Sequence, residues 1–145
     1  MNESAKAAEE HCIFCKIIRG EIPCAKIFED DHVLAFLDIN PAAPGHALVV
    51  PKAHAQTLLD VSPNSGNALV AALQKVGRAI MIECGATGFN CMQNNFASAG
   101  QVVPHVHWHV IPRFDNDELF SIPAGQYPST KEMQLLATAV ETNII

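Results

Sequence analysis

The stretch His105–Ile111, HVHWHVI, alternates histidines with apolar residues inside a β-branched run from Val102 to Pro112. Residues of this kind favour extended structure, so the run predicts a β-strand over residues 102–112. Because side chains on a strand point alternately to its two faces, the three histidines share one face, about 6.5–7 Å apart. The apolar residues between them are then expected to pack on the core.

The flanking sequence predicts the other strands of a sheet. Runs rich in apolar residues and bounded by turn residues indicate four further strands: Ala25–Glu29, His32–Asp38, His46–Pro51 and Gly88–Asn95. The first two are separated only by Asp30-Asp31, so they are expected to form a β-hairpin. The segment Pro41–Gly45 predicts a turn and Ala97–Gly100 a flexible loop, because small residues and proline dominate them.

One long helix is predicted between Ser62 and Gly85. Ser62 precedes Pro63, which is the usual order of N-cap and first helical residue, and glycine at position 85 is a typical helix stop. Apolar residues recur between them at helical spacing: Leu69, Leu73, Val76 and Ile80. A short final helix is predicted over Lys131–Val140.

The order of these elements indicates the fold class. Strands and helices do not alternate, which argues against repeated βαβ units. We therefore predict an α+β fold, with an antiparallel sheet, one long helix and short terminal helices. The 145 residues suit one domain. We expect a flexible tail at residues 1–10, and a single domain over residues 11–145 that includes a C-terminal extension from about residue 114.

Composition and charge exclude several classes of protein. Hydrophobic residues make up 49% of the chain and charged residues 17%, enough apolar material for a compact core. The net charge of -6 is unsuited to duplex binding, which relies on Lys and Arg against phosphates, so no nucleic-acid partner is expected. No signal-peptide core or membrane-length apolar run is visible, so we expect a cytoplasmic protein without a membrane partner.

The histidines of residues 105–111 indicate a functional site, because three of them on one face of an apolar strand are hard to explain as solubility residues. A neutral imidazole can attack phosphorus, and neighbouring rings can donate hydrogen bonds to phosphate oxygens and to a leaving group. Asn94 and Gln101 can add neutral hydrogen bonds. A metal site, or histidines that are merely exposed on a half-buried strand, remain the alternatives.

The histidine pattern resembles the signature of the histidine triad family of nucleotide hydrolases and transferases. Further segments match that family in order: Phe14–Ile18, Gly20–Pro23, Phe28–Asp31, Ala35–Ile39, Pro44–His46, Val49–Lys52, Asn94 and Gly100-Gln101. The match covers residues 12–113 and looks most similar to the Hint branch and its bacterial relatives.

The resemblance implies a purine nucleotide substrate that is cleaved at its alpha phosphorus. It implies that His107 is the nucleophile that takes the nucleoside monophosphate. His109 and His46 would contact the phosphate, and His105 would orient His107, chiefly through its backbone carbonyl. The remaining matched positions are phosphate and leaving-group contacts (Asn94, Gln101), a ribose-binding carboxylate (Asp38) and the purine pocket (Phe14, Ile17, Phe36, Ile39). For the last four, ordinary core packing is an equally good interpretation.

The sequence departs from the family pattern in places. Val102 stands where Hint proteins often carry a serine that assists the leaving group, which weakens any inference of a preference for amine leaving groups. The segment after Arg113 does not resemble the short Hint C-terminus. Trp108 is larger than the usual residue between the histidines. Substrate selectivity therefore stays open.

The cysteines raise the question of a metal. Five cysteines are an odd number in a chain expected to be cytoplasmic, which argues against a disulfide framework. Cys12 and Cys15 have the spacing of a metal chelate or a redox pair, but the βαβ setting of a redox pair is missing. In bacterial histidine triad proteins and related galactose-phosphate uridylyltransferases, zinc is held at positions matching Cys12, Cys15, His54 and His105. The resemblance therefore implies a structural zinc.

Three functions remain as alternatives. The first is a hydrolase or transferase that works through a His107 adduct on nucleoside phosphoramidates, dinucleoside polyphosphates or aminoacyl adenylates. The second is a nucleotide-binding scaffold with little catalysis. The third is a metalloenzyme with its catalytic metal on the histidine strand, although that strand carries no carboxylate. The family dimerises through the long helix and a neighbouring strand, so a homodimer is also implied.

Overall fold

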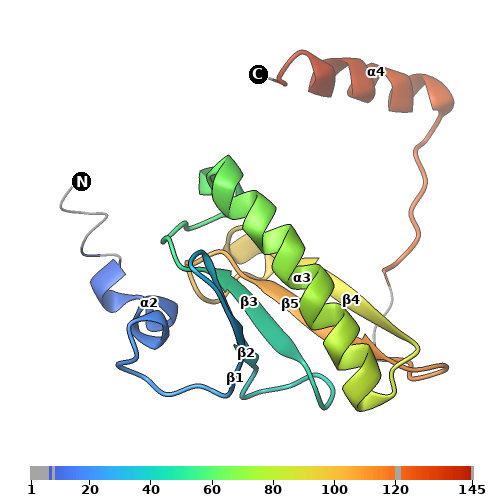
Figure 1. The fold of residues 1–145 in the computed structure, drawn as a ribbon. Helices are drawn as coiled ribbons and strands as arrows, with labels where there is room; N and C mark the ends of the chain where they lie inside the picture. Colours follow the sequence, from blue (N-terminus) through green and yellow to red (C-terminus); the bar gives the residue numbers. More distant parts are fainter. Residues whose placement is uncertain (1–6, 8, 120–121, 145) are drawn as a thin grey trace.

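The fold is an antiparallel sheet with a long helix across one face (Figure 1), and a short helix packs on the other face. The computed structural model describes residues 7, 9–119 and 122–144. Its helices are α2 (Ile13–Ile18), α3 (Pro63–Cys84) and α4 (Thr130–Glu141), with 3₁₀ turns at Leu58–Asp60 and Ala97–Ala99. Its strands are β1 (Lys26–Glu29), β2 (Val33–Leu37), β3 (Ala47–Pro51), β4 (Gly88–Gln93) and β5 (Trp108–Arg113). The predicted α+β class is confirmed.

The sheet has the strand order β1-β2-β3-β5-β4, and every neighbouring pair is antiparallel. The predicted hairpin is β1–β2, and its turn is held by Asp30, whose carboxylate accepts bonds from the amides of His32 and Val33. All five residues of β3 are buried. Because both of its faces are covered, its sequence is continuously apolar rather than alternating.

Helix α3 covers one face of the sheet, and the sequence signals for its ends are confirmed. The Ser62 side chain accepts a bond from the Ser65 amide, and Gly85 adopts a left-handed conformation with φ of 65°. The helix contributes Leu69, Ala72, Val76 and Ile80 to a core with Val33, Ala35, Ala47, Val49 and Val110 of the sheet. Trp108 packs partly buried against this same core.

Helix α2 covers the opposite face, and it positions the site. Cys12, Phe14 and Cys15 pack with the residues of β2 and β3 that point away from α3, namely Leu34, Phe36, Leu48 and Val50. Leu48 pairs with His109 across β3 and β5, so His109 belongs to the α2 face. The histidines and the two cysteines therefore meet on the face that α3 leaves open.

The predicted strand over residues 102–112 is wrong in its first half, because β5 begins only at Trp108. Pro104 has no amide hydrogen for a sheet ladder. The next two amides bond outside the sheet: His105 N–H donates to the Val103 carbonyl, and Val106 N–H donates to the Ala55 carbonyl. Two of the three histidines thus precede the strand, in an irregular segment.

Outside the sheet, the structure adds detail to the predicted loop and to the predicted final helix. The predicted loop at Ala97–Gly100 contains a 3₁₀ turn that ends at Gly100, with φ of 87°. The predicted final helix is confirmed as α4, all of whose residues are exposed; it lies apart from the sheet (Figure 1). Most of the predicted tail at residues 1–10 lies outside the described residues.

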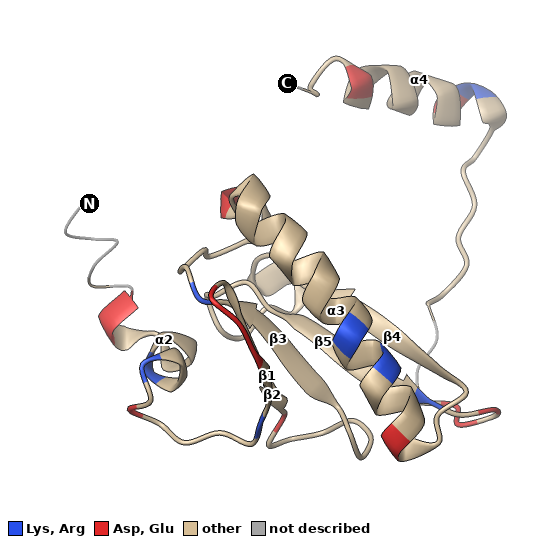
Figure 2. Cartoon of the chain, in the orientation of Figure 1, with Lys and Arg blue, Asp and Glu red and all other residues tan. Residues whose placement is uncertain are grey.

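The distribution of basic residues and the length of the apolar helices matter for binding to nucleic acids and membranes. Lys and Arg are dispersed over α2, α3, α4 and the ends of strands rather than gathered in one stripe (Figure 2). Among the described residues, no helix is both long and apolar enough to cross a membrane.

Candidate active site

His107 lies at the centre of the site with one ring nitrogen fixed by the backbone. Its Nδ1 is 2.7 Å from the His105 carbonyl oxygen, which can only accept, so Nδ1 carries the hydrogen. In the neutral ring, Nε2 then holds a lone pair, as a nucleophile requires. The ring is buried and packs edge-on against Phe14, with centroids 5.2 Å apart. This is the bond that the family resemblance implies for the residue pair.

A second chain of bonds fixes the tautomers of His46 and His109. The Ala42 amide donates to Nδ1 of His46 over 3.0 Å, so Nε2 of His46 carries the hydrogen. That hydrogen is donated to Nδ1 of His109, 2.9 Å away. His109 therefore carries its own hydrogen on Nε2, which makes it a donor toward a phosphate oxygen or a leaving group.

Lowered pKa values favour the neutral form of the His46 and His109 rings. Burial lowers the pKa of His109 to about 4, with added repulsion from His107 and His46, while Asp38 opposes the shift. Burial also lowers the pKa of His46, again against the pull of Asp38. Neutral imidazoles can act as single-hydrogen donors with the tautomers described above.

Asp38 joins the site from the end of β2. Its Oδ2 lies 3.7 Å from Nε2 of His46, and its Oδ1 accepts from the Asn40 amide at 2.9 Å. The histidine strand carries no carboxylate of its own, but the fold brings one close to it. Asp38, His46 and His109 each place a ligand atom within 4.8 Å of the others.

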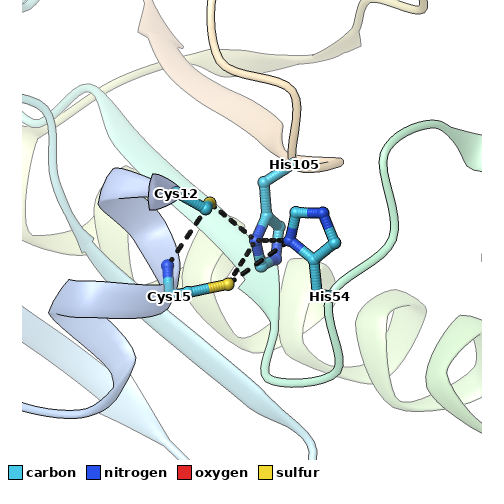
Figure 3. Close-up of side chains that lie close together, drawn as sticks. All are labelled: Cys12, Cys15, His54 and His105. Carbon is cyan, nitrogen blue, oxygen red and sulfur yellow. Dashed lines mark hydrogen bonds between the residues drawn. The ribbon is translucent and has the colours of Figure 1, made fainter. Parts of the chain in front are cut away.

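Cys12, Cys15, His54 and His105 form a second cluster beside His107, with all ligand atoms within 4.8 Å of one another (Figure 3). Nδ1 of His105 is 3.4 Å from Cys12 Sγ, 3.5 Å from Cys15 Sγ and 3.3 Å from Nδ1 of His54. A tetrahedral ion with zinc's bond lengths sets N···S at about 3.5 Å and N···N at about 3.3 Å. The four residues therefore fit a metal site.

The chemistry of the donors agrees with that geometry. Nε2 of the fully buried His105 is 2.9 Å from the Pro51 carbonyl and must carry the hydrogen, so Nδ1 presents a lone pair to the thiols. Burial and the neighbouring Cys12 raise the pKa of Cys15 to about 12. A bound cation would stabilise the thiolates that this burial disfavours.

The structure separates the residues assigned to the purine pocket. Phe14 and Phe36 are buried in edge-on contact, with centroids 5.8 Å apart, and Ile17 packs partly buried against the same cluster. Ile39 is 90% exposed and is not part of that cluster.

Asn94 and Gln101 have different surroundings. Asn94 is half-buried just beyond the end of β4, where Gln93 pairs with Trp108. Gln101 braces its loop: it donates to the carbonyls of Gln56 and Val103 and accepts from the Phe96 amide. Val102, beside it, is 89% exposed.

Two contributors to the site carry no sequence signal. The Ala42 amide and the Pro51 carbonyl set the tautomers of His46 and His105, respectively. Both are backbone groups, which every residue type supplies, so no side-chain pattern can point to them.

Comparison with known proteins identifies the family. The model of the HIT domain matches residues 19–116. The chain belongs to the histidine triad (HIT) family. It is 46% identical over 111 residues to Protein hit of Bacillus subtilis, covering 77% of each chain. It is 40% identical over 134 residues to the adenosine 5'-monophosphoramidase hnt1 of Schizosaccharomyces pombe, covering 92% of this chain and 98% of that one.

Solved structures of the HIT family agree with the fold. A HIT family protein from Bacillus subtilis superposes with a TM-score of 0.86 at 37% identity, over 93% of this chain and 98% of that one. A Zn-bound histidine triad family protein from Mycobacterium smegmatis gives a TM-score of 0.73 at 35% identity, over 92% and 96% of the two chains. Two relatives bear the names adenylylsulfatase HINT3, from Arabidopsis thaliana, and adenosine 5'-monophosphoramidase hnt1.

Proposed function

We propose that this HIT protein cleaves the bond between the alpha phosphorus of a purine nucleotide and its leaving group, through a covalent nucleotidyl-His107 intermediate. The observation that carries the proposal is the bond from Nδ1 of His107 to the His105 carbonyl, which leaves Nε2 as a lone pair. The relative named adenosine 5'-monophosphoramidase supports a phosphoramidase-like reaction.

In this mechanism, Nε2 of His107 forms a bond to the alpha phosphorus, and the bond from phosphorus to the leaving group breaks. The leaving group departs with its electron pair and takes a proton from solvent, which the water of the second step gives back. Nε2–H of His109 donates to a phosphate oxygen or to the leaving group, and Asn94 adds a neutral donor. Gln101 would add a second donor only by releasing the carbonyl of Gln56 or Val103, to which its Nε2 hydrogens are donated. Water then attacks the phosphorus, releases the nucleoside monophosphate and restores His107. Asp38 would hold the ribose hydroxyls, and the purine would lie against Phe14, Ile17, Phe36 and Ile39.

The test is release of adenosine monophosphate from an adenosine phosphoramidate and from a dinucleoside polyphosphate. We expect His107→Asn to lower turnover by at least about a thousandfold while nucleotide affinity stays within about threefold. Release from the dinucleoside substrate alone would indicate polyphosphate hydrolysis instead. Tight nucleotide binding without turnover by the unaltered protein would support a scaffold, and full turnover by the variant would disprove the mechanism.

We also propose that the metal held by Cys12, Cys15, His54 and His105 is zinc with a structural role. The four-ligand sulfur and nitrogen set and its spacing support this, as does the Zn-bound relative. Metal analysis of protein purified without a histidine tag is expected to give about one zinc per chain. Folded protein that takes up far less zinc when zinc is supplied would contradict the proposal.

A second candidate function, catalysis by a metal, is favoured only by the approach of Asp38 to His46 and His109. We prefer the hydrogen-bond chain, because it already accounts for Nε2 of His46 and Nδ1 of His109. The Cys15→Ser variant, which removes one ligand of the cysteine–histidine cluster, distinguishes catalysis by a metal at Asp38, His46 and His109 from catalysis by His107. If that variant still holds one metal per chain, and a chelator removes its activity, the catalytic-metal function would be favoured.

We further propose a homodimer. β4 is an edge strand of the sheet, and α3 next to it exposes Val70 and Ile82. An unpaired edge beside exposed apolar residues is suited to joining two sheets. Sedimentation of the pure protein is expected to give twice the mass of one chain, and a monomer at micromolar concentration would contradict this.

A further inference from the structure

The proposed nucleophile lies outside the hydrogen-bonded sheet. On both sides of β5 the cross-strand pairing ends at Trp108, which pairs with Val49 on β3 and Gln93 on β4. His107 precedes this point, and the neighbouring Val106 amide bonds to the Ala55 carbonyl of the loop after β3. The position of the His107 ring therefore depends on contacts other than strand pairing.

Two such contacts lead directly to the cysteine–histidine cluster. The first is the 2.7 Å bond from Nδ1 of His107 to the carbonyl of His105, whose own side chain is in the cluster. The second is the Phe14 ring, which meets both imidazoles edge-on, 5.2 Å from His107 and 5.9 Å from His105 between centroids. Phe14 lies between Cys12 and Cys15 in the chain, so both contacts depend on cluster residues.

The cluster gathers three segments that the sheet does not hold. Cys15 lies on α2 and Cys12 is its N-cap, His54 belongs to the loop after β3, and His105 to the irregular segment before β5 (Figure 3). α2 has only six residues, too few for a stable helix without tertiary contacts. An ion bound to all four side chains would therefore tie α2 and the His105 backbone together.

The cluster is also accessible from outside. A hollow of about 590 Å³ is bordered by Cys12 and His54, together with His11, Gln56 and Val103. His54 is only half-buried, in contrast to the other three ligands. The hollow therefore offers a chelator a route to His54, and we expect a bound ion to be exchangeable in the folded chain.

We propose that Cys12, Cys15 and His54 are positioning residues for catalysis: metal bound by them and by His105 holds the His105 carbonyl and the Phe14 ring, and thereby fixes the tautomer and orientation of His107. The inference rests on the proposed function, since it concerns the same nucleophile. It predicts that metal occupancy sets the rate of the chemical step and has little effect on nucleotide affinity.

The experiment compares zinc-loaded protein, protein treated with a chelator, and the same protein reloaded with zinc. Protein labelled with ¹⁵N-histidine reports the protonation of each ring nitrogen, and the His107→Asn spectrum assigns His107. At about pH 8, above the reference pKa of a free imidazole, we expect a single Nδ1–H tautomer in the loaded state and averaged nitrogen shifts after chelation. Reloading is expected to restore the single tautomer. Circular dichroism of all three samples checks that the sheet is kept.

Kinetics and variants complete the test. Chelated protein and Cys15→Ser should lose at least about tenfold in kcat with KM within about threefold, because a small displacement of a reacting group slows chemistry more than binding. Cys91→Ser, at an exposed cysteine outside the cluster, should change nothing. Identical His107 shifts with and without zinc, or failure of the folded protein to bind zinc, would overturn the inference. If the loaded protein has no turnover, the proposed function fails while the His107 spectrum still decides this inference.

Discussion

Three of the four histidines of the site use one ring nitrogen for the protein and present the other to a ligand, whereas His46 uses both within the protein. His105 uses Nε2 for the Pro51 carbonyl and presents Nδ1 to the cluster; His107 uses Nδ1 for a carbonyl and presents Nε2. His46 accepts from the Ala42 amide and passes a hydrogen to His109, whose Nε2 then carries one. Four identical side chains thus have different functions because backbone groups assign their tautomers.

At this scale, the depressed pKa of His109 predicts an acid sensitivity of the fold. An unfolded histidine takes a proton at about pH 6.5, whereas burial in the folded protein holds the pKa of His109 at about 4. Between these values the unfolded chain binds more protons, so the free energy of unfolding falls as pH falls through this window.

Denaturant unfolding between about pH 7 and pH 5 measures the effect. We expect a shallower fall in the free energy of unfolding for His109→Gln than for the unaltered protein, because the neutral amide removes the proton linkage. His32→Gln, at an exposed histidine, is the control and should keep the original slope. Equal slopes in all three proteins would mean that His109 is not buried as described.

Among the elements, the turn before β3 is constrained by Gly45. Its φ is +93°, and a Cβ there would lie 2.5 Å from Sγ of Cys84 at the end of α3. Gly45→Ala is therefore expected to destabilise the fold by about 1–3 kcal/mol, and to displace the adjoining His46. Thermal unfolding and the loss of the His46–His109 bond by NMR would check the two effects.

Gly66→Ala is the matched control, because it lies within α3 and an added Cβ meets nothing within 4 Å. Alanine is the better helix former, so this variant should gain about 0.5–1 kcal/mol. Equal stability changes for the two substitutions would show that the close approach of Gly45 to Cys84 does not matter.

The elements also show what the sequence could predict. Strands, the long helix and both of its ends follow from local patterns and caps. The grouping of Cys12, Cys15, His54 and His105 follows only from the family resemblance, and no local pattern predicts helix α2. The start of β5 was not, because it depends on the Ala55 carbonyl, far away in the chain. The approach of Asp38 to His46 also required the β2–β3 register.

In the molecule as a whole, helix α4 stands out because none of its residues is buried in the single chain. All twelve of its residues are exposed, and isolated helices of about 12–15 residues are marginal in water. Met133, Leu136 and Val140 recur at helical spacing and form an apolar stripe. Such a stripe is expected to be covered by a second copy of the chain in the proposed homodimer.

Leu136→Asp places a charge in the middle of that stripe, on a side chain that is 52% exposed in the single chain. If the stripe is buried in the dimer, the dissociation constant should rise at least about tenfold, which corresponds to about 1.4 kcal/mol. Thr138→Asp introduces the same charge on the opposite side of α4 and should leave dimerisation unchanged. Sedimentation over a range of concentrations measures both. A dimer that is weakened equally by the two variants would point to loss of helix α4, whereas a dimer indifferent to Leu136→Asp would place the contact on β4 and α3 alone.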